Sequence, residues 1–254
     1  MNVLYVVGTG SRHDNAELRW SLRSLEAYGT NLGRVIVAGY PPDWLSGEVT
    51  RVPFADDPSA GYKHVNILNC ILEACRTGAA DGEFLYSSDD HFLVKPVDLG
   101  SYPYFFKRER IRSEDEYAKA NVSLTRYRRS LAETRTVLEL NGYEPREWSC
   151  HANTHMDSAD AAEVERLAAY AKGTMGFALG LEPTCCFMSV RHRRSPVTPV
   201  PRRDLKVKCV ASGRELLERI AERDTFSISD RVFDNPDFAR GMDTWFKDKS
   251  KFEK

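Results

Sequence analysis

The chain has 254 residues, which is long enough for one large α/β domain or for two small ones. A hydrophobic fraction of 42% and a charged fraction of 29% are ordinary for a globular protein and exclude wholesale disorder. The formal net charge of −1 excludes an argument for a nucleic-acid partner from total charge, so such a partner would need a local basic patch.

The N-terminal segment and the cysteines are typical of a protein that stays in the cytoplasm. No apolar run reaches the roughly 18 residues needed to cross a bilayer, and residues 1–14 lack the basic region and the long apolar stretch of a signal peptide. The six cysteines show neither a C-x-x-C motif nor a framework spacing. We therefore expect reduced thiols, no membrane span and a cytoplasmic location.

The first hundred residues alternate between strand and helix patterns. Leu18, Leu22 and Leu25 recur at helical spacing, and the apolar runs on either side are typical of buried strands. The expected elements are strands over 2–7, 34–39 and 49–54, helices over 14–29 and 61–77, and a strand, an acidic turn and a short apolar segment over 83–97. This alternation predicts an α/β fold with a mostly parallel sheet flanked by helices.

The second half of the chain is less regular and largely helical in composition. We expect helical structure over 113–140, a loop over 145–158, a helix over 160–172, a buried strand over 183–190, a basic connection over 191–208 and a helix over 213–223. No internal repeat or low-complexity tract interrupts the sequence. A single domain over 1–254 with an irregular helical C-terminal half therefore fits better than two independent units.

The acidic turn at Ser88, Asp89 and Asp90 is the sharpest chemical signal. Two adjacent carboxylates follow an apolar strand directly, and an isolated buried pair of this kind is too costly unless it is solvated, paired or bound to a cation. Mg²⁺ or Mn²⁺ would relieve the repulsion and would also bridge the phosphates of a bound nucleotide. The alternative is a surface turn with two solvated acids.

A second turn, Gly8-Thr9-Gly10, follows the first strand. Its small residues would let backbone amides approach a phosphate or a base, although the third glycine of the dinucleotide fingerprint is missing. A plain turn is the alternative. Ligands of parallel sheets bind beyond the carboxyl ends of the strands, so both turns are expected to face one crevice.

Several segments together resemble the Stealth-type capsular polysaccharide transferases and the related bacterial and phage glycosyltransferase-like proteins. The resemblance rests on four blocks that cover about the first 100 residues: VVGTGSRHDNAELRWSLRSLEAYG, RVIVAGYPPDWL, the Lys63-x-x-Asn66 helix and FLYSSDDHFL. Ser88 stands where the family has asparagine, and His151-Ala152-Asn153 lacks the proline of the family's H-x-P block. The end of the chain, with FSISD and KSKFE, is also similar to the phage-type members.

The resemblance implies a GT-A-like, Rossmann-like fold and a metal-dependent glycosyltransferase that uses a nucleotide-sugar donor in the bacterial or phage-infected cytosol. Residues 1–110 would form the nucleotide-sugar-binding half and 111–254 the acceptor-side half. Asp89 and Asp90 would hold Mn²⁺ or Mg²⁺. Lys63 and Asn66 match a family block, and Lys63 would neutralise donor phosphate, although a surface lysine is the alternative.

The remaining candidate residues are assigned from residue type and spacing. Arg19 and Arg23 lie four residues apart on one helix face and would clamp the diphosphate, unless that face is simply solvated. His151 would be the general base on the acceptor or a third metal ligand, His155 competes for this role, and each has a structural histidine as its alternative.

The acceptor stays open between DNA and a glycan. The basic segments 126–129 and 191–208 would hold a polyanion if they gathered beside the crevice, and the phage relatives suggest DNA with a hydroxymethylated pyrimidine. A solvated, Arg-rich linker is the alternative. Two other functions stay open as well: a sugar-phosphate transferase acting on a polysaccharide, and a non-catalytic nucleic-acid or glycan-binding protein on a transferase-like fold.

Overall fold

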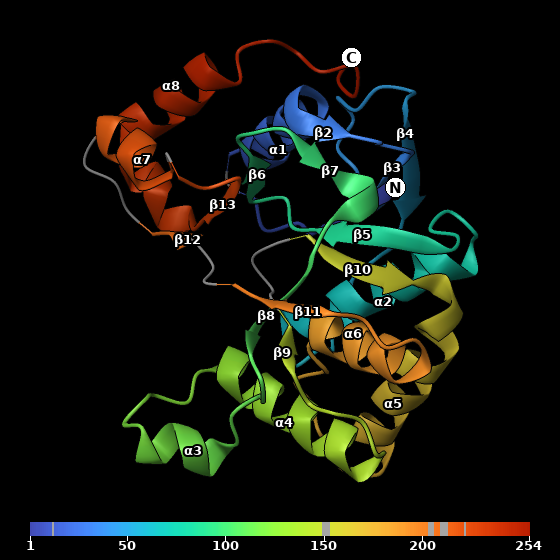
Figure 1. Cartoon of the computed structure of the whole chain (residues 1–254). Helices are drawn as coiled ribbons and strands as arrows, with labels where there is room; N and C mark the ends of the chain where they lie inside the picture. Colours follow the sequence, from blue (N-terminus) through green and yellow to red (C-terminus); the bar gives the residue numbers. More distant parts are fainter. Residues whose placement is uncertain (12, 149–152, 203–205, 209–212, 221) are drawn as a thin grey trace.

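The computed structural model describes residues 1–254 except 12, 149–152, 203–205, 209–212 and 221 (Figure 1). Its centre is a five-stranded sheet in the order β10-β5-β1-β3-β4, in which only β10 runs antiparallel to its neighbour. The strands are β1 Asn2–Val7, β3 Val35–Gly39, β4 Val49–Pro53, β5 Glu83–Ser87 and β10 Thr154–Asp157. The predicted α/β class with a mostly parallel sheet is thereby confirmed.

Helices cover both faces of this sheet (Figure 1). Successive side chains of a strand point to opposite faces, so Leu4 of β1 packs in one hydrophobic cluster while Val3 and Tyr5 pack in another. The Leu4 cluster includes residues of α2 (Lys63–Arg76), α4 (Arg126–Leu140), α5 (Ala161–Gly173) and α6 (Pro183–Arg194). The second cluster holds Leu18, Leu22 and Leu25 of α1 (Ala16–Tyr28), as the helical spacing predicts.

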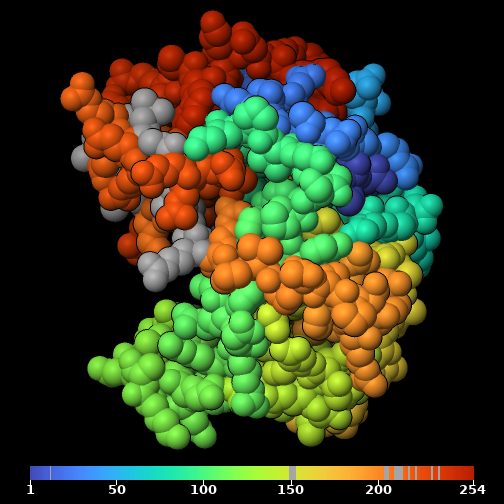
Figure 2. Space-filling model, viewed as in Figure 1, coloured from blue at the N-terminus to red at the C-terminus, as the bar shows by residue number. Residues whose placement is uncertain are grey.

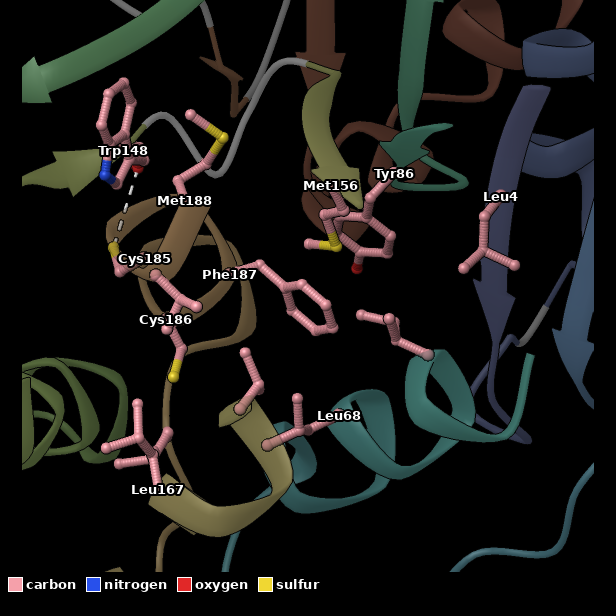
Figure 3. Close-up of a cluster of buried hydrophobic side chains, with 14 of the residues drawn as sticks. Leu4, Leu68, Tyr86, Trp148, Met156, Leu167, Cys185, Cys186, Phe187 and Met188 are labelled. Carbon is pink, nitrogen blue, oxygen red and sulfur yellow. Dashed lines mark hydrogen bonds between the residues drawn. The ribbon is translucent and has the colours of Figure 1, made fainter. Parts of the chain in front are cut away.

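The predicted buried strand over 183–190 is wrong, because this segment forms the helix α6. Pro183 is in its first turn, and the Glu182 side chain accepts a hydrogen bond from the Cys185 amide at its start. Almost every side chain of the helix is buried; Figure 3 shows Phe187 directed toward Leu68 of α2 and Tyr86 of β5. A helix that is buried all round has no polar face, so its sequence resembles that of a core strand.

The segment 145–158 was expected to be a loop, and this prediction is also partly wrong. It contains the short strand β9 (Glu147–Trp148) and the edge strand β10, which pairs with β5. The helical prediction for 113–140 is confirmed as two helices, α3 (Glu114–Lys119) and α4. Asn121, with a positive φ, lies in the turn between them.

The C-terminal segment folds back over α1. Strand β13 (Thr225–Ile228) pairs with β6 (His91–Leu93), the short strand after the acidic turn, and with β12 (Lys206–Val207). Figure 2 shows this orange and red segment packed against the blue N-terminal elements. The remaining elements are β2 Gly29–Thr30, β7 Val97–Asp98, η1 Leu99–Ser101, β8 Tyr104–Arg108, η2 Ser158–Asp160, β11 Pro199–Pro201, α7 Gly213–Ile220, η3 Asp230–Asp234 and α8 Pro236–Trp245.

The last residues of the chain are anchored on the first half. Phe252 is buried with the side chains of α1 and β3, and Glu253 forms an ion pair with Arg23 at 2.8 Å. Across the described part of the chain, the model contains no helix that is both long and apolar enough to pass through a membrane.

Candidate functional site

A cavity of about 860 Å³, which we call the main cavity, lies where β1 and β5 end. This is the edge at which ligands of parallel sheets bind. Residues far apart in the sequence line it, among them Gly8, Thr9, Gly10, His13, Glu17, Asp56, Lys63, Asn66, Asp89, Asp90, Lys206, Lys208, Arg231 and Phe233. The structure therefore brings together the glycine turn, the acidic turn and the Lys63-x-x-Asn66 helix, as the sequence predicts.

The acidic turn is held rigidly between buried elements. The His91 amide donates to the Ser88 carbonyl at 3.3 Å and closes the turn, and the Ser21 hydroxyl of α1 donates to the His91 carbonyl at 2.6 Å. On the other side, the Ile228 amide of β13 donates to the Asp90 carbonyl at 3.0 Å. The backbone of the turn is thus fixed at the end of β5, and Asp89 and Asp90 both line the main cavity.

The electrostatics of the pair favour a bound cation. Burial, followed by the charges of Asp90 and Glu17, raises the pKa of Asp89 to about 7, while Lys63 lowers it. A like charge close by disfavours ionisation, and a divalent ion reverses that effect. The half-buried Asp89 is therefore a poor isolated anion but a good ligand for a hard cation.

Basic side chains line the main cavity together with the acids. Lys206 of β12 places its Nζ 3.0 Å from Oδ2 of Asp90, and Lys208 and Arg231 are exposed at the same cavity. Sequence analysis noted Lys206 and Lys208 only as part of a basic connection, and it missed Glu17, Asp56 and Arg231. No local signal identifies them, because the β12-β13-β6 pairing that brings this segment to the acids is long-range.

The first turn of α2 contributes one charge and one structural contact. Lys63 lines the main cavity beside Asp89, as predicted. Asn66 lines it as well, but its Oδ1 accepts a hydrogen bond from the Asp57 amide at 2.9 Å. Asn66 therefore fixes the loop that carries Asp56, and its contribution to a bound ligand is at least partly indirect.

The predicted diphosphate clamp of Arg19 and Arg23 is not supported by the structure, because neither side chain lines the main cavity. Arg23 donates two hydrogen bonds of 2.8 Å to the carboxylate of Glu253 and one of 2.9 Å to the Phe246 carbonyl. Arg19 stacks over the Trp44 ring at 4.0 Å and pairs with Asp14 and Glu253. Both arginines therefore hold the C-terminal end of the chain.

Of the two histidine candidates, the structure describes only His155. His151 lies outside the described residues. His155 is buried on β10, where Nδ1 lies 2.8 Å from Oε1 of Glu83 and Nε2 lies 2.6 Å from the Tyr102 carbonyl. Both ring nitrogens of His155 are engaged, and the ring does not line the main cavity. The structure therefore corrects the catalytic prediction for His155 to a structural role.

Two arginines of the predicted polyanion surface are paired with acids of the protein itself, while Arg126 and Arg129 of the segment 126–129 are exposed. Arg191 bonds Glu83 and Asp157, and Arg194 bonds Asp157 and Asp160. The guanidinium of Arg202 lies over the Phe105 ring. Of the basic residues of 191–208 that the structure describes, Lys206 and Lys208 are the ones that reach the main cavity.

The residues of the acidic turn fit Mg²⁺ or Mn²⁺. Within the described residues, no group of three or more His, Cys, Asp and Glu side chains is placed to hold a metal ion. A magnesium-type ion does not need such a cage, because it is commonly held by one or two carboxylates together with waters and substrate phosphates. Asp89 and Asp90 would supply the carboxylates, and Lys63 and Lys206 would face the phosphates.

A scan of the chain against models of known protein families finds no match, and a search of curated proteins finds no significant match either. The family resemblance drawn from the sequence blocks therefore stays a prediction, and the function has to be argued from the site itself.

Proposed function

We propose that the chain is a metal-dependent glycosyltransferase with a GT-A-like fold, which moves a sugar from a nucleotide-sugar donor to a hydroxyl acceptor. One observation carries the proposal: a pair of carboxylates and a set of cations line one cavity at the carboxyl edge of a parallel sheet. A divalent cation would neutralise the two carboxylates, and the diphosphate of a donor would pair with the cation and with the lysines.

The role assigned to the acidic and to the basic lining residues follows from their charge. A divalent cation bound at Asp89 and Asp90 would stabilise the negative charge that develops on the leaving diphosphate. Lys63, Lys206 and Lys208 would bind the phosphate oxygens and raise donor affinity. The glycine turn at 8–10 would let backbone amides come within hydrogen-bonding distance of the donor.

A thermal-shift screen of uridine, guanosine, cytidine and thymidine sugars, with and without Mn²⁺, tests the proposal. A true donor at about 100 times its Kd stabilises the protein by about 2.7 kcal/mol, which corresponds to roughly 5–10 °C in Tm for a chain of this size. We expect this shift to require Mn²⁺. A flat response to every donor in the presence of Mn²⁺ would refute the proposal.

Two variants with a matched control locate the effect. Asp89→Asn and Asp90→Asn should abolish the Mn²⁺-dependent shift. Asp81→Asn should preserve it, because Asp81 is an exposed acid that precedes the start of β5, whereas Asp89 and Asp90 follow its end. The nucleotide released on turnover then separates the two enzyme classes. A nucleoside diphosphate indicates glycosyl transfer, and a nucleoside monophosphate indicates sugar-phosphate transfer.

A further inference from the structure

A second cavity of about 320 Å³ adjoins the main one and shares Lys63, Asp89, Asp90 and Lys206 with it. Half of the residues that line it alone carry aromatic rings, and we call it the aromatic cavity. They include Tyr62, His64, Tyr86, Tyr127, Glu182 and Thr184. Because the two cavities meet at the acidic turn, a ligand in the aromatic cavity would lie next to the metal end of a donor in the main cavity.

The aromatic wall is built by two helix starts. Tyr62 precedes α2 and packs edge-on against the His64 ring, with centroids 4.7 Å apart and planes at 70°. Tyr127, in the first turn of α4, also packs edge-on with that ring, with centroids 5.7 Å apart. Nδ1 of His64 lies 2.8 Å from the Ser130 hydroxyl, so the histidine is locked and the tyrosines are held in fixed positions.

Glu182 places a carboxylate among these rings. Only 3% of the residue is exposed, and its Oε2 accepts hydrogen bonds of 2.7 Å from the Thr184 hydroxyl and from the Cys185 amide. Burial raises the pKa of this carboxyl above its ordinary value. A general base works best when its pKa lies near the working pH, so the burial suits such a role.

Resting on the proposed function, we infer that the aromatic cavity binds the acceptor as a neutral saccharide ring and that Glu182 takes the proton from its attacking hydroxyl. In the reaction the acceptor oxygen forms a bond to the anomeric carbon of the donor. The bond from that carbon to the phosphate oxygen breaks, and the nucleoside diphosphate leaves with the electron pair. The acceptor proton moves to the Glu182 carboxylate.

The lining of the aromatic cavity favours a saccharide over a DNA acceptor. The aromatic side chains and the Glu182 carboxylate suit the C–H faces and hydroxyls of a sugar. Of the charged residues, Lys63, Lys206, Asp89 and Asp90 are shared with the main cavity, so the charge that belongs to the aromatic cavity alone is that of Glu182, which would repel a phosphate. The arginines that would have to grip a DNA backbone, such as Arg191 and Arg194, are already paired with Glu83, Asp157 and Asp160. Small-molecule sites commonly combine an apolar lining with a few fixed polar groups in this way.

Saturation-transfer NMR tests the inference with a panel of methyl hexopyranosides and disaccharides, added to the protein with nucleoside diphosphate and Mg²⁺, which is diamagnetic and leaves the saccharide signals sharp. We expect at least one saccharide to bind. Tyr127→Leu should weaken that binding about tenfold or more, equivalent to about 1.4 kcal/mol, and leave nucleotide affinity unchanged. Tyr143→Leu is the matched control, because Tyr143 packs under Arg193 and lines neither cavity.

Glu182→Gln tests the proton transfer separately. Its amide oxygen can still accept the hydrogen bonds at the start of α6, so saccharide and nucleotide affinity should stay within about twofold while turnover falls about 10²–10⁴-fold. Glu147→Gln, at a buried acid paired with Arg108 outside both cavities, should not lower turnover.

The outcomes separate this inference from the proposed function. If the nucleotide-sugar binds but no saccharide does, or if Tyr127→Leu leaves saccharide binding unchanged, the acceptor assignment is wrong and the donor site stands. If Glu182→Gln turns over like the wild type, Glu182 is not the base. Failure of every nucleotide-sugar to bind would remove the proposed function and this inference together.

Discussion

At the scale of single residues, Gly8 and Gly10 separate folding from binding. A Cβ added at either position meets no heavy atom of the described residues within 4 Å, and neither residue has a positive φ. The free protein therefore has no steric need for glycine there, and alanine should raise stability slightly, by up to about 1 kcal/mol, through the unfolded state.

Donor binding should respond in the opposite direction to these substitutions. If backbone amides of this turn approach a phosphate, the added methyl group obstructs the approach, and Gly8→Ala or Gly10→Ala should weaken donor affinity about tenfold, which is about 1.4 kcal/mol. Titration calorimetry measures the affinity. Gly47→Ala is the control, because its added Cβ is equally unhindered and it does not line the main cavity. Unchanged affinity in both turn variants would show that the turn does not contact the donor.

His64 gives the protein a pH-dependent stability. Burial lowers its pKa from 6.5 to about 3 in the folded state. Between these values the unfolded chain binds a proton that the folded protein does not, so stability is complete above pH 6.5 and is lost as the pH falls. From pH 7 to pH 5 the loss should be roughly 1–2 kcal/mol.

Urea denaturation at pH 7 and at pH 5 measures this loss. His64→Gln should reduce it, although some should remain, because burial also lowers the pKa of His155 and gives a contribution of the same sign. His13→Gln, at an exposed histidine, should keep the wild-type difference. An equal loss in wild type and His64→Gln would show that His64 is not the source.

At the scale of secondary-structure elements, α1 joins the C-terminal end of the chain to the sheet. The side chains of Arg23 and Glu253 are 17% and 1% exposed, so removing one leaves a largely buried charge without its partner. Arg23→Gln should lower the free energy of unfolding by roughly 1–3 kcal/mol and leave donor affinity unchanged. Lys63→Gln should show the opposite pattern, with weaker donor binding and little change in stability. Denaturation and calorimetry on both variants distinguish an anchor from a phosphate ligand.

Element prediction from the sequence succeeded where a local pattern marks an element and its end. Continuous apolar runs located β1, β3 and β5, because each run ends at a turn with small or charged residues, and one-sided apolar spacing located α1 and α2. The helix α6 was missed because its apolar residues are buried on every side, which removes the periodicity that distinguishes a helix from a strand. Strand β10 was missed because only its pairing with β5, about 70 residues earlier in the chain, makes it a strand.

At the scale of the whole molecule, the site combines parts that differ in how far the sequence can predict them. The glycine turn, Lys63 and the acidic pair follow strand ends and helix starts of the first half, so local patterns were sufficient. Lys206, Lys208 and Arg231 reach the same cavity only because β13 pairs with β6. Residues of both 1–110 and 111–254 therefore line the main cavity, while the expected division into a donor half and an acceptor half stays a prediction.

This arrangement couples the C-terminal segment to the acidic turn. Nζ of Lys206 lies 3.0 Å from Oδ2 of Asp90, so a cation that uses this oxygen has to displace the lysine. The displaced Lys206 can then bind a donor phosphate. Lys206→Gln should therefore bind Mn²⁺ alone as well as or better than the wild type, and bind the nucleotide-sugar with Mn²⁺ about tenfold more weakly.

Hydrogen exchange should show the same coupling in the wild-type backbone. The Ile228 amide donates to the Asp90 carbonyl and the Ser229 amide donates to the Val207 carbonyl, so both report on how firmly β12 and β13 hold the turn. Donor and Mn²⁺ together should slow the exchange of these two amides, because a ligand that contacts both the acidic turn and the β12-β13 segment stabilises the hydrogen bonds between them. The Tyr117 amide of α3, a residue that lines neither cavity, should exchange at the same rate with and without ligand. Protection confined to residues 1–100 would mean that the ligand binds the acidic turn alone and that the C-terminal cations have no part in holding it.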